Sequence, residues 1–252
     1  MIIYLETGLI GDSLATLPAV WEQVQNEKVF LKSQNKEVSS FLPSHMNLVH
    51  VDEIESAADI TLNASHTFSR CIGNGEHMSQ GHFFFLGLPI PQEVPTIEFA
   101  LHPTKEAVGF DFLVAAGSNS DSNNNKKWPF ENWQVVIDWL REQGYTVGSL
   151  SGGSEADPIF SNCVNIMGQS LHDVANEILN VKLAVLTVDN GISHLTRMLK
   201  APHVLIYPQC LPLHFVGNKD ALTIRGEPLH IKIDDVENLI NQMIEKHVLL
   251  HK

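Results

Sequence analysis

Three short segments of the chain bring glycine, carboxylate, amide and basic side chains close together: GLIGD at 8–12, GSNSDSNNNKKWP at 117–129 and VDNGISHL at 188–195. Each segment follows a short apolar run that predicts a β-strand and precedes a stretch with helical spacing. Ligands of parallel α/β domains bind beyond the carboxyl ends of the strands, where such strand-to-helix loops lie. The three loops are therefore candidate sites.

The first loop places a carboxylate at the start of a helix. Gly8 and Gly11 allow a tight turn from strand to helix, and Asp12 then falls in the first helical turn. The dipole of the helix stabilises a carboxylate at that position. Such a side chain can accept a proton in catalysis, or it can simply cap the helix, and spacing alone favours the cap.

The second loop has the composition of a phosphate-binding loop. Ser118 and Asn119 can offer hydroxyl and amide groups to a phosphate at the end of a strand. Lys126 or Lys127 can supply a point charge. The alternative is a solvated surface loop with two ordinary lysines, and spacing alone favours that alternative.

The third loop combines a strand end with a helix start. Asp189 ends the strand, the chain turns at Gly191, and Ser193 and His194 begin the helix. The backbone N–H groups of a helix start form an anion site, to which His194 can add a hydrogen bond. The alternative is a capped helix with a packed histidine.

Outside these three loops the sequence offers one further candidate residue and lacks several standard motifs. Glu155 follows a Gly-Gly turn at a strand end and can accept hydrogen bonds from ribose hydroxyls, although a solvated glutamate is the simpler interpretation. The histidines lack HxxxH and HExxH spacing, and the motifs GxGxxG, GxxxxGK[ST] and GxSxG are absent. We therefore expect no metal, no cofactor, and no standard dinucleotide, P-loop or serine-hydrolase site.

The composition limits the class of protein further. Hydrophobic residues make up 44% of the 252 residues and charged residues 18%, which is typical of globular rather than disordered chains. The net charge of −13 argues against nucleic acid as a partner, because binding to phosphate backbones needs clustered lysine and arginine. Three widely spaced cysteines, no signal-peptide pattern and no apolar run of membrane-spanning length favour a reduced, cytoplasmic setting.

Apolar strands alternate with amphipathic helices along the chain, which predicts an α/β protein with parallel sheets. Strands are expected at 1–5, 29–32, 48–51, 58–62, 112–115, 146–150, 164–167, 183–188, 204–207 and 222–224. Helices are expected at 12–25, 36–41, 76–86, 131–143, 170–180, 193–199 and 234–246. A proline-rich stretch from Pro89 to about Pro103 predicts a linker between two such sheets.

Taken in order, LETGLIGDSLATLPAV, VAAGSNSDSNNNKKWPFENWQVVIDWLREQGYTVGSLSGGSEAD and MGQSLHDVANEILNVKLAVLTVDNGISHLTRMLKAPHVLIY resemble glycosyltransferase family 9, the ADP-heptose:lipopolysaccharide heptosyltransferases. The resemblance implies a GT-B fold, in which two Rossmann-like domains face each other across a cleft, with the first domain abbreviated. It implies an N-terminal acceptor-side domain at 1–104 and a nucleotide-sugar-binding domain at 105–233. The C-terminal helix, 234–252, can pack back on the first domain in this fold.

The resemblance also assigns roles to residues. It implies inverting transfer of a heptose or related sugar from an ADP-linked or similar donor, with Asp12 as the catalytic base. The implied donor and phosphate-binding residues are Ser118, Asn119, Lys126, Glu155, Asp189, Asn190, Gly191, Ser193 and His194. Lys126 rather than Lys127 keeps the family's spacing to Trp128, and Asn190 stands where the family usually has Thr or Ser.

The acceptor implied by the family is a glycan or glycoconjugate of lipopolysaccharide biosynthesis, reached through peripheral contact with the inner membrane. Residues 1–104 carry four basic and twelve acidic side chains, a balance of −8, which favours a neutral or cationic acceptor over a heavily phosphorylated one. Two other functions stay open: a non-catalytic module that binds sugar nucleotides, and a GT-B epimerase or hydrolase that needs no acceptor.

Overall fold

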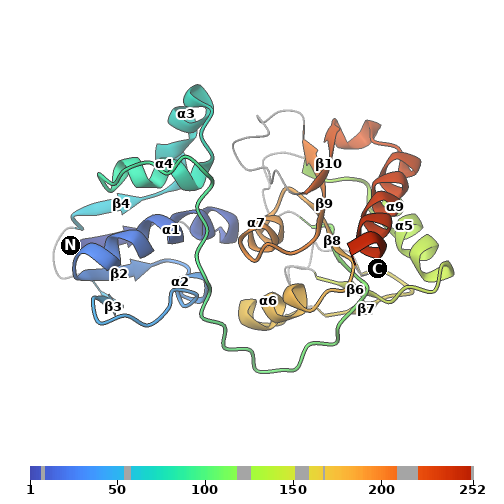
Figure 1. Ribbon diagram of the computed structural model, residues 1–252, viewed down its shortest axis with the longest axis horizontal. Coiled ribbons are helices and arrows are strands. Elements are labelled where there is room, and N and C mark those ends of the chain that lie inside the picture. Colours follow the sequence, from blue (N-terminus) through green and yellow to red (C-terminus); the bar gives the residue numbers. More distant parts are fainter. Residues whose placement is uncertain are drawn as a thin grey trace. The chain divides into compact units, whose positions relative to one another are not determined.

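The computed structural model describes residues 1–6, 9–53, 58–117, 126–150, 159–166, 168–208 and 221–250. The contacts divide the chain into two compact units, of which Met1–Leu101 is the first and the described residues from His102 onward form the second. Each unit is an α/β unit built on a parallel sheet (Figure 1). Within the described residues, no helix is both long enough and apolar enough to cross a membrane.

The first unit has a four-stranded parallel sheet with the order β3-β2-β1-β4. Its elements are β1 (Ile2–Leu5), α1 (Ile10–Asn26), β2 (Val29–Ser33), α2 (Lys36–Ser39), β3 (Leu48–His50), β4 (Ile60–Leu62), α3 (Ala64–Asn74) and α4 (Met78–Phe85). The order places β1 at the centre, so that α1 begins at the carboxyl edge of the sheet. Helix α4 packs on α1 and on α3.

Helix α1 buries one long apolar face, which includes Leu14, Leu17 and Val20. The helix begins at Ile10, two residues earlier than its apolar spacing predicts. Leu9 therefore occupies the N-cap position and provides no side-chain cap, whereas Asp12 lies within the first turn. Asp12 is therefore not the N-cap residue itself; its carboxylate lies in the first turn, at the end of the helix where the exposed backbone amides lie.

The second unit has a six-stranded sheet with the order β10-β9-β8-β5-β6-β7, and all its described strand pairs are parallel. Its strands are β5 (Phe112–Ala115), β6 (Val147–Ser149), β7 (Val164–Asn165), β8 (Ala184–Val188), β9 (His203–Pro208) and β10 (Leu222–Gly226). The helices are α5 (Phe130–Glu142), α6 (Leu171–Leu179), α7 (Gly191–Met198), the 3₁₀ helix η2 (Pro228–His230) and α9 (Ile233–Leu250).

This strand order is that of a Rossmann-like sheet. The chain runs outward from β5 to β7 on one side, returns to β8 beside β5, and then runs outward to β10 on the other side. The strand order thus reverses between β5 and β8, and such a reversal leaves a crevice at the carboxyl ends of the two central strands. Figure 1 shows α5 and α9 on one face of the sheet and α6 and α7 on the other.

The core of the second unit lies between the sheet and the pair α5 and α9. Trp128 and Trp133 are fully buried there, and the indole of Trp128 donates a 3.0 Å hydrogen bond to the carbonyl of Ile231. Val236, Ile240 and Met243 of α9 complete this core. The apolar face of the C-terminal helix therefore packs within the second unit, on β9, β10 and α5.

The end of the predicted linker is tied to α6. The carboxylate of Asp173 accepts hydrogen bonds from the backbone of Thr104 at 2.6 Å, from the Thr104 hydroxyl at 2.9 Å and from the backbone of Lys105 at 3.1 Å. The carboxylate of Glu177 accepts from the backbone of Val108 with both oxygens at 3.1 Å. These contacts fix residues 104–108 as part of the second unit.

Candidate functional site

The site lies where the carboxyl ends of β5 and β8 meet. The two strands pair in parallel, with Ala115 opposite Thr187, so that the residues following each strand leave the sheet at the same edge. Asp189 and Asn190 follow β8, and helix α7 begins immediately after them at Gly191. Because this edge is also the point where the strand order reverses, it is the ligand-binding position of a doubly wound sheet.

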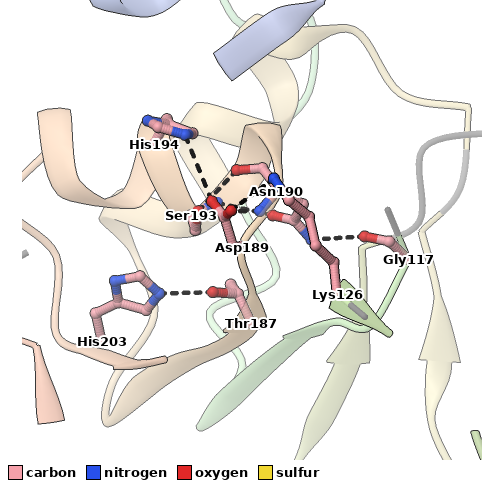
Figure 2. Close-up of polar contacts among 8 residues, drawn as sticks. All are labelled: Gly117, Lys126, Thr187, Asp189, Asn190, Ser193, His194 and His203. Carbon is pink, nitrogen blue, oxygen red and sulfur yellow. Dashed lines mark hydrogen bonds and ion pairs between the residues drawn. The ribbon is translucent and has the colours of Figure 1, made fainter. Parts of the chain in front are cut away.

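An ion pair links two of the expected site residues across this edge. The Nζ atom of Lys126 lies 2.7 Å from Oδ2 of Asp189 (Figure 2). The Asp189 side chain is only 3% exposed, whereas that of Lys126 is 22% exposed. The ammonium group thus neutralises a buried carboxylate and also reaches solvent, where it can meet an anionic ligand.

His194 faces the same carboxylate from α7. Its Nε2 atom lies 3.7 Å from Oδ1 of Asp189, and the side chain is 7% exposed. Burial lowers the pKa of His194 to about 4, outweighing the nearby Asp189 carboxylate, which raises it. The imidazole is therefore neutral at pH 7. Its Nδ1 atom is buried and has no hydrogen-bond partner in the described part of the chain.

The start of α7 presents backbone donors. Asn190 is the N-cap: its Oδ1 atom accepts a 2.9 Å hydrogen bond from the Ser193 backbone, and the Ser193 hydroxyl closes a reciprocal capping box with the Asn190 backbone. The next two amides, those of Gly191 and Ile192, donate to no acceptor among the residues that the structure describes. Free amides at the positive end of a helix dipole attract an anion.

The side-chain amide of Asn190 also reaches across to β5. Its Nδ2 atom donates to the carbonyl of Ala115 at 2.9 Å. The same atom donates to the carbonyl of Gly117 at 2.7 Å (Figure 2). Asn190 therefore joins the start of α7 to the carboxyl end of the neighbouring strand.

Three buried polar residues beneath the site were not expected from the sequence. The Nε2 atom of His203 lies 2.7 Å from the hydroxyl of Thr187, and burial lowers the pKa of His203 to about 3. Arg197 of α7 is 6% exposed, and burial lowers its pKa to about 10. Thr187 was detectable as the only polar residue of the apolar run AVLTV, but nothing in the local pattern marks His203 or Arg197.

The described structure places the remaining expected residues as follows. Asp12 lies in the first unit, in the first turn of the helix that follows the central strand β1. Ser118, Asn119 and Glu155 lie outside the described residues. In the described part of the chain, no group of three or more His, Cys, Asp or Glu side chains is arranged to hold a metal ion.

A chain with two parallel α/β units, one of which is a Rossmann-like sheet with a lysine and a helix N-terminus at its switch point, has the composition of elements found in GT-B proteins. The comparison with family models then names the family. The chain belongs to glycosyltransferase family 9 (heptosyltransferase), whose model matches residues 77–238 and so includes the whole of α7 and its loop.

Individual relatives agree with this assignment. The lipooligosaccharide heptosyltransferase 2 of Haemophilus influenzae is 24% identical over 135 residues, which cover 47% of this chain and only 39% of that protein. The dodecameric iron-containing heptosyltransferase TibC of E. coli, solved in complex with ADP-D-beta-D-heptose, has a TM-score of 0.72 and 14% identity over 98% of this chain and 76% of that one. The E. coli heptosyltransferase WaaC with ADP has a TM-score of 0.67 and 18% identity over 96% of this chain and 99% of that one. At these identities the structural likeness establishes the GT-B fold.

Proposed function

We propose that this protein is an inverting glycosyltransferase that moves a heptose or related sugar from an ADP-linked or similar donor to a hydroxyl of a glycan or glycoconjugate. The observation that carries the proposal is the charge and donor arrangement at the switch point of the second sheet. Lys126 and the free amides of Gly191 and Ile192 meet at an edge where a diphosphate can bind. Membership of family 9 supports the same donor class.

The donor site supplies the electrostatic part of the reaction. As the bond between the anomeric carbon and the diphosphate oxygen breaks, negative charge grows on the departing diphosphate. Lys126 and the N-terminus of α7 can stabilise this charge, and the neutral His194 can donate one hydrogen bond to it. Ser118 and Asn119 are proposed to add hydroxyl and amide contacts, and Glu155 to accept from the ribose.

Asp12 is proposed as the general base. The acceptor oxygen attacks the anomeric carbon on the face opposite the leaving diphosphate, and its proton passes to the Asp12 carboxylate. One displacement inverts the configuration and yields a glycoside and a nucleoside diphosphate. Asp12 lies in the first turn of α1, the helix that follows β1 at the carboxyl edge of the first sheet, where ligands of parallel α/β units bind.

The test is an Asp12→Asn substitution assayed for donor binding and for transfer. Binding of ADP, measured by calorimetry, should stay within about twofold of the unsubstituted protein, whereas transfer should fall by about 10²–10⁴. Glu22→Gln, on an exposed position of the same helix, is the matched control and should keep full activity. Equal turnover by Asp12→Asn would remove the general-base role.

The same assay separates the alternative functions. A non-catalytic module would bind ADP or an ADP-sugar and transfer nothing to any member of an acceptor panel. A hydrolase or epimerase would release or convert the sugar with no acceptor present. Absence of binding to ADP, UDP, GDP and CMP in a thermal-shift screen would contradict the proposed donor site itself, because binding raises the melting temperature by mass action.

The acceptor is proposed to be neutral or cationic. The balance of −8 over residues 1–104 would repel a heavily phosphorylated glycan. Paired acceptors that differ only in their phosphate groups test this proposal. The dephosphorylated member should react faster, and its advantage should shrink as salt screens the charges.

A further inference from the structure

Two consecutive side chains hold the two ends of one segment of the chain. Asn190 donates to the carbonyl of Gly117, which precedes residues 118–125, and Asp189 pairs with Lys126, which follows them. The two contacts, both at 2.7 Å, come from the same short connection between β8 and α7. Figure 2 shows the carbonyl of Gly117 and the side chain of Lys126 on the same side of this connection.

The side-chain amide of Asn190 makes contacts in two directions. Its amide nitrogen carries two N–H groups, which reach the carbonyls of Ala115 and Gly117, while its oxygen caps α7 by accepting from Ser193. A serine or threonine hydroxyl carries only one donor and cannot make both contacts to β5. Both N–H groups are used inside the protein, so they are not available to donate to a ligand.

We propose that Asn190 is a positioning residue: with Asp189 it forms a clasp that holds Gly117 and Lys126 at the start of α7. The clasp sets the place of the lysine relative to the free amides of Gly191 and Ile192. The contribution of the clasp to ligand binding rests on the proposed function, because the group that Lys126 and these amides would bind together is the diphosphate of the donor. The contacts of Asn190 with Gly117 and of Asp189 with Lys126 are made within the protein and need no ligand.

The decisive variant is Asn190→Ser in the full chain. Serine is as good an N-cap as asparagine and adds no charge, so the cap and the electrostatics of the site are kept while the contacts to Ala115 and Gly117 are lost. Asn190→Ser releases Gly117, so that of the two contacts of the clasp the ion pair of Lys126 with Asp189 is left. Trypsin should then cut after Lys126 and Lys127 at least about fivefold faster in the absence of nucleotide. The Kd of ADP and the KM of the donor should each rise about tenfold, with kcat at saturating donor within about twofold.

Ser170→Ala is the matched control for stability alone. Ser170 caps α6 of the same unit, so its loss should lower the melting temperature by about 2–4 °C and leave both ADP binding and tryptic cleavage after Lys126 and Lys127 unchanged. Asn190→Asp is a second test, because a carboxylate keeps the cap but repels both carbonyls. It should be cut at least as fast as Asn190→Ser.

Each outcome decides the proposal. If Asn190→Ser is cut no faster than the unsubstituted protein, or is cut faster but binds ADP equally well, the positioning role is overturned. The same holds if it only loses stability as Ser170→Ala does. If the unsubstituted protein binds no nucleotide at all, the proposed donor site fails, and the cleavage rates then decide the clasp on their own.

Discussion

At the scale of single residues, the dominant feature of the site is a buried carboxylate that pairs with a lysine. Asp189 is almost fully buried, and the ammonium group of Lys126 lies 2.7 Å from its Oδ2 atom. A Lys126→Met substitution should therefore have two effects: the loss of a charge that receives a diphosphate, and an uncompensated carboxylate in the interior. We expect ADP affinity to fall at least about tenfold and the free energy of unfolding to fall by about 1–3 kcal/mol.

A double variant separates these two effects. Adding Asp189→Asn to Lys126→Met removes the buried charge, so most of the lost stability should return, measured by urea denaturation, while ADP affinity stays low. Lys127→Met changes the neighbouring lysine and should alter neither property by more than about 0.5 kcal/mol. Recovery of ADP affinity in the double variant would show that Lys126 acts only on structure.

The buried histidines predict a dependence of stability on pH. Burial keeps His194 and His203 neutral in the folded protein, with pKa values of about 4 and about 3 against an ordinary value of 6.5. Between pH 6.5 and about 4 the unfolded chain binds protons that the folded chain does not. The free energy of unfolding should therefore be highest above pH 6.5 and fall below it, by at most about 1.4 kcal/mol per pH unit for each histidine.

Urea denaturation at pH 7.5, 6 and 5 measures this fall. His194→Gln should reduce the slope, because glutamine binds no proton in either state. His230→Gln, at a side chain that is 78% exposed, is the control and should not change the slope of the free energy of unfolding against pH. A slope that His194→Gln does not change would contradict the assignment of the pH effect to this histidine.

The sequence predicted, for a physical reason, that several of the candidate residues would lie at one edge of a sheet. Lys126 and the run from Asp189 to His194 lie in strand-to-helix loops, and parallel sheets bring such loops to one edge. The contact of Asn190 with Gly117 was not predictable, because it joins residues 73 positions apart and depends on which two strands are neighbours. The pairing of Thr187 with His203 depends on the same neighbour order.

At the scale of elements, Asp173 and Glu177 of α6 hold residues 104–108 on the second unit. Asp173→Ala removes the acceptor of three hydrogen bonds from Thr104 and Lys105, and it should lower the melting temperature by several degrees. Trypsin should then cut after Lys105 faster than in the unsubstituted protein. Asp235→Ala changes an exposed acid in the first turn of α9 and should shift the melting temperature by less than about 2 °C.

Elements with strong periodicity were predictable, and those with weak periodicity were not. The apolar spacing predicted α1, α5, α6, α7 and α9 and most strands of both sheets to within a few residues. Helix α3, with the sequence ASHTFSRCIGN, was missed because it contains few apolar residues and ends near two glycines, Gly73 and Gly75. Helix α3 is stabilised by its packing against α4, and the local sequence does not show this tertiary contact.

At the scale of the whole molecule, the two units have separate sheets and separate sets of contacts. Proteins with more than one such unit commonly unfold in more than one step, and a ligand stabilises the unit that binds it. The tryptophans suit a test of this kind. Trp21 lies in α1 of the first unit, whereas Trp128, Trp133 and Trp139 lie in the second.

ADP should therefore raise the stability of one unit and not the other. In a Trp21→Phe variant the tryptophan fluorescence comes from the second unit alone. ADP at 100 times its Kd should stabilise the unfolding transition that this fluorescence reports by about 2.7 kcal/mol. Circular dichroism follows the helices of both units, so it should show a second transition that ADP leaves in place. Coincident transitions that both shift with ADP would mean that the two units unfold as one, because only coupled unfolding passes the binding energy of the second unit to the first.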